Sequence, residues 1–343
     1  MKGLRRGSKL VRSIDRYIGI PVVCILGLLK KMQKDRQPLI NMRKIAILKI
    51  NAIGDTVLLS AAIKDLRDKY QDVQLTMFVG ESNYEIATML PGINEIIRLE
   101  LRNPFRAIRN VRERGKYDLW IDFGPWPRLN AIISYFALAD YKIGFNTKGQ
   151  YRHYIYDKTV KHSPDVHECY NYKNLVKLVG VEGGNGPSLL VAENEKRNDK
   201  ILTLHLFPGG SKSYLKEWPD ENWIAIIKYF IDRGFQIYLT GAKVDQPRAL
   251  SLAEKLNNKN VFVVAGEYDL KKTVKLLKQS ALVITVNTGI MHIASAIGCN
   301  VISIQGPTSS VRWGPLNSNS IAINSYLPCS PCLNLGFESA CDD

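Results

Sequence analysis

Asp55, whose carboxylate can do chemistry, and Gly54 before it directly follow the first segment with the pattern of a buried strand. Glycine permits a tight turn and the close approach of a bound molecule. An aspartate at the carboxyl end of a strand can act as a general base toward a substrate. It can equally be the N-cap of the helix that follows, because Asp is among the best N-caps, and the residues alone leave both interpretations open. There is no G-x-G-x-x-G motif, which disfavours a dinucleotide-dependent oxidoreductase.

A second segment, FPGGSK from residue 207, follows the first predicted strand of the second half. Small residues such as Ser211 expose backbone N–H groups, and Lys216 a few residues on adds positive charge. Together they form a plausible site for a diphosphate. The alternative is a glycine-rich surface turn with solvated lysines.

A third segment, VNTGIMH over residues 286–292, ends a predicted strand and begins a helix. Thr288 and Gly289 would lie at the helix N-terminus, where N–H groups and the helix dipole favour phosphate oxygens. His292 is placed to approach the same anion, and the alternative is a histidine at the edge of the core.

Three of the six cysteines gather near the C-terminus, at Cys329, Cys332 and Cys341. Their spacing resembles part of a zinc site, but a fourth ligand is not visible. A structural metal or thiol cluster therefore stays open, and a catalytic metal is disfavoured. No disulfide framework fits this long chain with few cysteines, which indicates a reducing compartment.

The positive charge is concentrated at the N-terminus. The chain has 47 Lys and Arg against 32 Asp and Glu, a net charge of +15. Residues 1–44 hold twelve basic and two acidic residues, so +10 of this charge lies there. The basic residues flank an apolar stretch, which indicates anionic lipid more than nucleic acid as the partner.

That apolar stretch covers residues 17–29, which is too short to span a bilayer as a helix. A signal peptide is disfavoured because basic residues, and no small-x-small cleavage site, come next. We expect segment 1–40 to lie at a membrane surface. A short span and a helix packed on the protein body are the alternatives.

Predicted strands and helices alternate after this segment, which is typical of parallel sheets with helical crossovers. The predicted strands cover residues 44–50, 75–79, 96–99, 119–122, 201–206, 236–240, 261–264, 282–286 and 301–304. Residues 183–200, glycine-rich and then charged, are predicted to be a linker. A chain of 343 residues is longer than one hydrophobic core usually serves. We therefore expect two doubly wound α/β domains, at 41–182 and 201–343, with the site in a cleft between them.

In combination these segments resemble the heptosyltransferase family of glycosyltransferases. The matching stretches, in order over roughly residues 44–332, are KIAILKINAIGDTVLLSAAIKDLRDKY, YDLWIDFGPWPRLNAIISYFALADYKIGF, PGGSKSYLKEWPDENW and ALVITVNTGIMHIASAIGCNVISIQGPTSSVRWGP. The resemblance implies a GT-B fold of two Rossmann-like domains, an acceptor-binding first half and a donor-binding second half. It also implies an inverting reaction without a metal ion or other cofactor, and an ADP-linked sugar as donor.

The resemblance further implies roles for single residues. Asp55 would remove the proton of the acceptor hydroxyl, with Gly54 beside it and Arg128 facing an anionic acceptor. Lys216 would stabilise the departing diphosphate. The other residues expected on the donor side are Ser211, Asp245, Asn287, Thr288, Gly289 and His292, with Asp245 at the nucleotide ribose. An inverting displacement needs a base on one side and positive charge on the other, which these residue types supply.

Asn287 departs from the family, which usually has Asp at this position. Asn retains the hydrogen-bonding shape but loses a charge, so donor affinity or the choice of sugar can differ. A proline that the family usually has near Ser60 and Ala61 is also missing, which we interpret as a structural difference.

We therefore predict a transferase that adds heptose or a similar sugar to a lipopolysaccharide-like or lipid-linked acceptor. It would lie peripherally on the cytoplasmic face of the inner membrane and bind no nucleic acid. The alternatives are a non-catalytic nucleotide-sugar or glycan-binding protein, and a nucleotide-sugar epimerase on the same fold.

Overall fold

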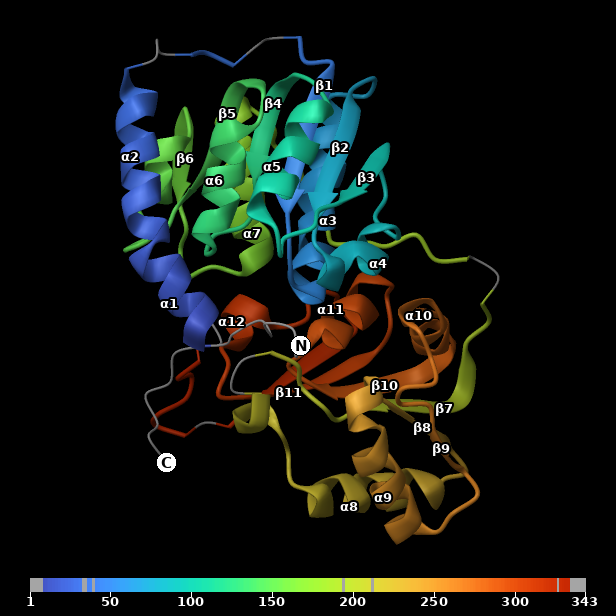
Figure 1. The fold of residues 1–343 in the computed structure, drawn as a ribbon. Coiled ribbons are helices and arrows are strands. Elements are labelled where there is room, and N and C mark those ends of the chain that lie inside the picture. The colour runs from blue at the N-terminus through green and yellow to red at the C-terminus, as the bar shows by residue number, and fades with distance from the viewer. Residues whose placement is uncertain are drawn as a thin grey trace. The chain divides into compact units, whose positions relative to one another are not determined.

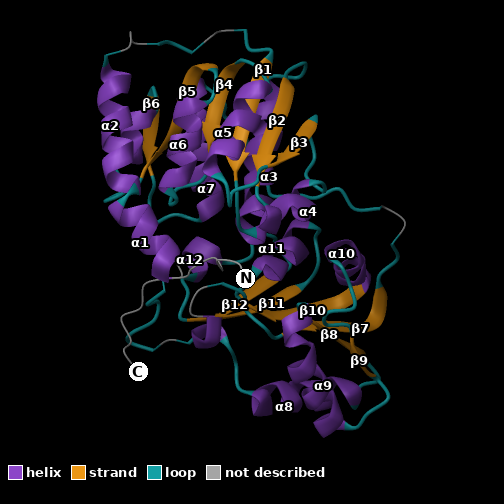
Figure 2. Cartoon of the chain, viewed as in Figure 1, coloured by secondary structure: helices purple, strands orange, loops and turns teal. Residues whose placement is uncertain are grey.

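The computed structural model describes residues 9–32, 36–38, 41–192, 195–210, 213–325 and 327–333. The chain divides into two compact units, Met1–Ser188 and Leu189–Asp343. The boundary falls within residues 183–200. Each unit is built around one parallel sheet with helices on both faces (Figures 1 and 2). The prediction of two doubly wound α/β domains is therefore confirmed.

The first unit has a six-stranded sheet in the order β3-β2-β1-β4-β5-β6, all parallel. Its strands are β1 (Lys44–Lys49), β2 (Gln74–Val79), β3 (Glu95–Arg98), β4 (Tyr117–Asp122), β5 (Ala139–Asn146) and β6 (Lys158–Lys161). Its longer helices after the first strand are α3 (Ile53–Lys69), α5 (Pro104–Glu113), α6 (Arg128–Phe136) and α7 (Glu168–Val176), with the short α4 (Tyr84–Ala87). Five of the six residues of β1 are buried, as expected of a central parallel strand covered on both faces.

The second unit repeats this topology, with the order β12-β11-β10-β7-β8-β9. Its strands are β7 (Asn198–His205), β8 (Gln236–Thr240), β9 (Val261–Val263), β10 (Ser280–Val286), β11 (Val301–Gly306) and β12 (Ser320–Asn324). Its helices are α8 (Asp220–Ile231), α9 (Gln246–Leu256), α10 (Leu270–Gln279), α11 (Gly289–Ala296) and α12 (Ser310–Trp313). In both units the strand order reverses beside the first strand, and binding sites of such sheets lie at the carboxyl ends of the strands around that point.

The N-terminal residues form two helices, α1 (Lys9–Tyr17) and α2 (Gly19–Lys31), at the outer side of the first unit (Figure 1). Ile18 continues the helical hydrogen bonding between them, since its N–H reaches Ile14 O and its carbonyl accepts from Val22 N. Pro21 does not break α2 because it lies in the first turn, where its missing N–H costs little. The helix α2 packs on α6 and on the short helix Arg152–Ile155, so packing on the protein body, one of the alternatives, is observed. Among the described residues, no helix combines the length and apolar character needed to cross a bilayer.

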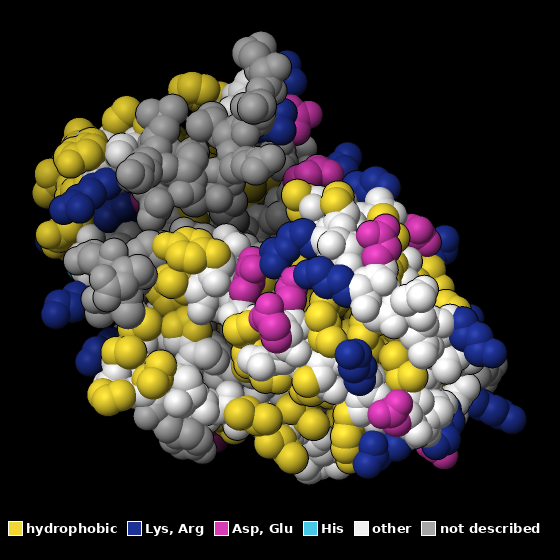
Figure 3. All heavy atoms as spheres, turned by 90° about the horizontal axis from the view of Figure 1, so that it is seen from below, with side chains coloured by type: hydrophobic (Ala, Val, Ile, Leu, Met, Phe, Trp, Pro, Cys, Tyr) yellow, Lys and Arg dark blue, Asp and Glu magenta, His cyan; other side chains and the backbone are white. Residues whose placement is uncertain are grey.

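The face shown in Figure 3 carries Lys and Arg side chains scattered between Asp and Glu side chains. Among the described residues of this face, the basic side chains therefore form no continuous patch.

Candidate active site

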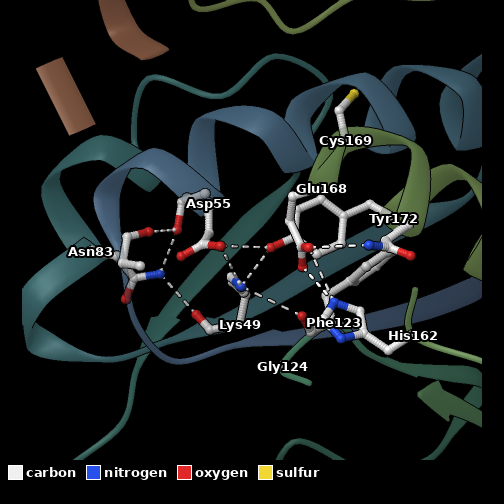
Figure 4. A network of polar contacts seen from close by, with 12 residues as sticks. Lys49, Asp55, Asn83, Phe123, Gly124, His162, Glu168, Cys169 and Tyr172 are labelled. Atoms are coloured by element: carbon white, nitrogen blue, oxygen red, sulfur yellow. Dashed lines mark hydrogen bonds and ion pairs between the residues drawn. The ribbon is translucent and has the colours of Figure 1, made fainter. Parts of the chain in front are cut away.

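Asp55 lies in the first turn of α3, at the carboxyl end of the first sheet (Figure 4). Its Oδ1 accepts a hydrogen bond from the Tyr172 hydroxyl at 3.0 Å and lies 3.8 Å from Lys49 Nζ. The side chain of Asp55 is 20% exposed, whereas that of Lys49 is 2% exposed. The carboxylate is therefore held from the protein side and is open to a substrate on the other.

The helix-capping alternative for Asp55 does not describe this site. The N-cap of α3 is Ala52, three residues earlier, and no side chain caps it. Ala52 has φ of +70°, in a region that residues other than glycine rarely adopt. Such strain costs about 1–3 kcal/mol and is typical of functional sites.

Lys49 and Tyr172 position Asp55, and the sequence analysis did not identify either. Lys49, at the end of β1, donates to the Tyr172 hydroxyl at 2.8 Å, and its ammonium lies 5.0 Å from the centre of that ring. Tyr172 comes from α7, 117 residues after Asp55 along the chain. The Tyr172 hydroxyl accepts from Lys49 and donates to Asp55. A buried cation and a phenol therefore fix the orientation of the Asp55 carboxylate together.

Asn83 and a histidine–carboxylate pair complete the surroundings of this site (Figure 4). Asn83 Nδ2 donates to Lys49 O at 2.8 Å and to Thr56 Oγ1 at 2.9 Å, which ties the end of β1 to the first turn of α3. His162 Nε2 lies 2.9 Å from Glu168 Oε1, and both side chains are buried. Asn83 lies 34 residues after Lys49 in the chain, so no short sequence motif contains both.

Arg128, predicted to face an anionic acceptor, contacts a carboxylate of the protein in the structure. Arg128 is the first residue of α6, not a loop residue, and it is 5% exposed. Its guanidinium Nη1 lies 2.5 Å from Asp15 Oδ2 of α1, and its backbone N–H donates to Asp15 Oδ1 at 2.8 Å. A carboxylate of the protein therefore occupies the place predicted for an acceptor anion. Gly54 is the second residue of α3 and is partly exposed.

In the second unit, Lys216 is the last residue of a short helical turn, Ser213–Lys216, after β7. Its Nζ donates to Gly209 O at 3.1 Å and to Asn287 O at 3.5 Å. Burial lowers the pKa of this ammonium group. The structure thus brings Lys216 and the segment 286–289 together, as a diphosphate site requires. Ser211 lies outside the described residues.

Thr288 and Gly289 lie at the N-terminus of α11, where the sequence predicted them. Thr288 is the N-cap and Gly289 the first helical residue, and no side chain caps the turn. His292 lies on this helix and is 5% exposed, so its burial matches the core-edge alternative as well. The first turn offers backbone N–H groups to an anion.

The Asn287 side chain connects the end of β10 to Gln305 and Trp313 by hydrogen bonds. Its Nδ2 donates to Gln305 Oε1 at 2.6 Å and to Trp313 O at 3.3 Å. An aspartate cannot donate these bonds, so the amide suits the neighbouring groups of this chain. Gln305 Nε2 in turn donates to Ser303 Oγ at 2.6 Å, which fixes the side-chain network after β11.

Asp245 lies at the N-terminus of α9, after β8, and is partly exposed. Its Oδ2 accepts from Ala242 N at 2.8 Å. The carboxylate therefore stabilises its own turn, and its contact with a ribose stays a prediction.

The predicted cysteine cluster is only partly described, because Cys341 lies outside the described residues. Cys329 and Cys332 are free thiols, the first exposed and the second half-buried. Cys332 N donates to Pro307 O at 3.0 Å, which attaches this segment to the loop after β11. In the described part of the chain, no group of three or more His, Cys, Asp or Glu side chains is placed to hold a metal ion.

Comparison with known proteins identifies the family. Residues 105–338 match the model of glycosyltransferase family 9 (heptosyltransferase). The chain is 23% identical over 314 residues to lipooligosaccharide heptosyltransferase 2 of Haemophilus ducreyi, covering 82% of this chain and 88% of that relative. It is also 23% identical over 308 residues to lipopolysaccharide heptosyltransferase 2 of Salmonella typhimurium, covering 82% and 87%.

Solved structures agree on the fold. The family 9 glycosyltransferase from Veillonella parvula has a TM-score of 0.74 at 19% identity, covering 85% of this chain and 88% of its own. The Escherichia coli heptosyltransferase WaaC with ADP has a TM-score of 0.70 at 20% identity, covering 82% and 93%. The family model covers more than half of the sequence, and the chain therefore belongs to glycosyltransferase family 9, the heptosyltransferase family, and is a glycosyltransferase.

Proposed function

We propose that this enzyme transfers heptose or a similar sugar from an ADP-sugar to a lipopolysaccharide-type or lipid-linked acceptor, with inversion and without a metal ion. The observation that carries the proposal is the division of chemistry between the units. The first unit holds a partly exposed carboxylate, Asp55, and the second holds a partly buried cation, Lys216, next to the start of a helix. The names of the relatives, which are heptosyltransferases of lipopolysaccharide and lipooligosaccharide, support the sugar and the acceptor.

The reaction is a single displacement. Asp55 accepts the proton of the acceptor hydroxyl as its oxygen forms a bond to the anomeric carbon. The bond between that carbon and the diphosphate oxygen breaks on the opposite face, so the configuration inverts. Lys216 and the N–H groups at the start of α11 stabilise the charge that develops on the leaving diphosphate.

Positive charge on Lys216 is effective here because its partial burial reduces screening by water. Fixed donors require no reorganisation during the reaction, which is why they can take the place of Mg²⁺. Ser211, Asp245 and His292 are assigned to the donor side, with Asp245 at the ribose.

The donor assignment is tested by melting the full-length protein with ADP, UDP or GDP in the absence of divalent metal. A ligand that binds only the folded state raises the melting temperature with the logarithm of its concentration over Kd. We expect a shift with ADP that the exposed-lysine control Lys259→Ala retains and Lys216→Ala loses. Equal shifts with all three nucleotides, or none, would contradict the ADP-sugar assignment.

The transfer itself is tested with ADP-heptose and heptose-deficient lipopolysaccharide in the presence of a chelator. NMR of the product should show an anomeric configuration opposite to that of the donor. Retention of configuration, or a requirement for added metal, would contradict the mechanism. Conversion of the donor without acceptor would instead indicate an epimerase.

We further propose that the enzyme acts peripherally at the cytoplasmic face of the inner membrane, where a lipid-linked acceptor is accessible. The concentration of basic residues at the N-terminus supports this location.

A further inference from the structure

An apolar stripe runs along the outer side of α1 and α2. Its members are the exposed residues Ile14 (46% exposed), Ile18 (60%), Ile25 (58%), Leu28 (66%), Leu29 (47%) and Met32 (84%), together with exposed Pro21. They recur every three or four residues, so they share one side of a nearly continuous helix. At 1.5 Å per residue the stripe is about 27 Å long.

The opposite side of α2 is already used for packing. Gly19, Val23 and Gly27 are buried there. A Cβ on Gly27 would meet Tyr154 Cβ at 2.5 Å, so the helix lies as close to the body as glycine permits. Lys30 of α2 also forms an ion pair with Asp157 at 2.5 Å. These contacts fix the rotation of the helix, so the stripe points away from the core.

Single exposed apolar side chains are ordinary on soluble proteins, but an aligned row of seven is not. A helix that is apolar on its outer side and flanked by basic residues is typical of the boundary between lipid headgroups and acyl chains. Figure 1 shows α2 at the outer side of its unit, where no other helix or strand among the described residues of that unit covers it.

A basic pocket lies beside the C-terminal end of α2. It has a volume of about 810 Å³, and its lining includes four basic residues, Arg36, Arg112, Lys116 and Lys142, and one acidic residue, Asp140. Burial, together with the nearby charges of Lys30 and Arg36, lowers the pKa of Lys142 to about 7. Since Lys30 belongs to α2, the pocket and the helix end are neighbours. The excess of positive charge fits the phosphate of an anionic lipid headgroup.

We propose that the stripe lies in the surface of an anionic phospholipid bilayer and that the basic pocket receives the headgroup phosphates. The proposal rests on the membrane location proposed above and deepens it, because it names the contact surface. The bilayer is favoured over a second copy of the chain because apolar and cationic groups adjoin here, and a bilayer with anionic headgroups is complementary to both.

The stripe is tested by sedimentation of the full-length protein with vesicles of phosphatidylcholine containing about one third phosphatidylglycerol. The variant Ile25→Asp/Leu28→Asp removes two apolar side chains and adds negative charge. We expect vesicle affinity to fall at least about a hundredfold. Leu250→Asp, at an exposed leucine on α9 of the second unit, is the matched control and should bind as the wild type does.

The pocket is tested with Arg36→Gln/Arg112→Gln on the same vesicles and on vesicles of phosphatidylcholine alone. We expect about a fivefold loss of affinity per removed charge on the anionic vesicles, and no change on the neutral ones. Lys259→Gln/Lys271→Gln, at exposed lysines of the second unit, is the control for total charge.

Two results would overturn the proposal. One is wild-type vesicle affinity of the stripe variant. The other is a lipid-free dimer of the wild-type protein that the stripe variant abolishes in analytical ultracentrifugation, because the stripe would then be an interface between copies. The ADP-dependent melting shift is measured on every variant. If a variant keeps the ADP-dependent melting shift but does not bind vesicles, the substitution has affected the membrane surface and left the donor site intact.

Discussion

The two units hold their predicted reactive groups in different ways. In the first unit, side chains from β1 and α7 fix Asp55 through hydrogen bonds and an ion pair. In the second, Lys216 lies against two backbone carbonyls, in surroundings that lower its pKa. A base needs one fixed orientation toward a hydroxyl, whereas a cation that serves a departing diphosphate needs to be desolvated and available to a new partner.

The largest effect should come from removing the fixed carboxylate. We expect Asp55→Asn to lower kcat by about 10³-fold, because the amide retains the shape but cannot accept the proton. Release of ADP with acceptor present measures the rate. The melting shift with ADP should stay as in the wild type, since the residue belongs to the other unit. Activity above one tenth of the wild-type value would contradict the role of Asp55 as base.

The cation of the second unit should give the next largest effect. Lys216→Met retains the apolar part of the side chain and removes the charge, and we expect kcat to fall by about a hundredfold. The same assay measures it, with Lys259→Met as an exposed control. Should both variants lose activity equally, the effect would come from net charge and not from the position of Lys216.

Buried histidines also differ between the two units, and one of them makes stability depend on pH. His162 of the first unit pairs with Glu168, whereas His205 of the second contacts the Thr240 hydroxyl through Nδ1. Burial lowers the pKa of His205 to about 4 from 6.5. Below pH 6.5 the unfolded state binds a proton that the folded state does not, so stability falls with decreasing pH until about pH 4.

Between pH 7 and 4.5 this difference amounts to about 2 kcal/mol in the free energy of unfolding. Urea unfolding at both pH values measures it. The variant His205→Gln should lose less stability than the wild type over this interval. An equal loss in both proteins would show that other groups cause the acid sensitivity.

The smallest effect is expected from the partner of the base. Tyr172→Phe removes the hydroxyl that donates to Asp55, and we expect kcat to fall about tenfold with KM unchanged. Tyr170→Phe, at a tyrosine of α7 that is 53% exposed, is the matched control. A change in KM alone would indicate that Tyr172 binds substrate instead of positioning the carboxylate.

The sequence predicted the alternation of strands and helices well, because central parallel strands are continuous apolar runs. It missed β5, β6 and β12. Asp140 and Lys142 interrupt the pattern of β5, although Lys142 is buried and donates to Ser134 O and Tyr135 O at the end of α6. An apolar pattern cannot reveal a buried ammonium whose partners are backbone carbonyls of another element.

The residues of the candidate site differ in how far a local motif indicates them. Asp55, Lys216 and Thr288 lie in the turns or helix starts that follow strands, where a local motif can indicate them. Lys49 and Tyr172 are brought to Asp55 by the sheet and by α7, and no spacing in the chain indicates that contact. The neighbour of Arg128 was also unpredictable, because Asp15 comes from a helix 113 residues earlier.

Asp15 competes with any bound anion for Arg128, because both would contact the same guanidinium group. A tethered carboxylate acts at an effective concentration on the order of millimolar, so an acceptor anion that uses Arg128 has to displace it. Any equilibrium that draws α1 away from α6 would raise the apparent affinity for that anion. By thermodynamic linkage, the bound anion would favour the displaced helix to the same degree. A bilayer that attracts α1 and an acceptor embedded in that bilayer would then bind cooperatively, although they contact different residues.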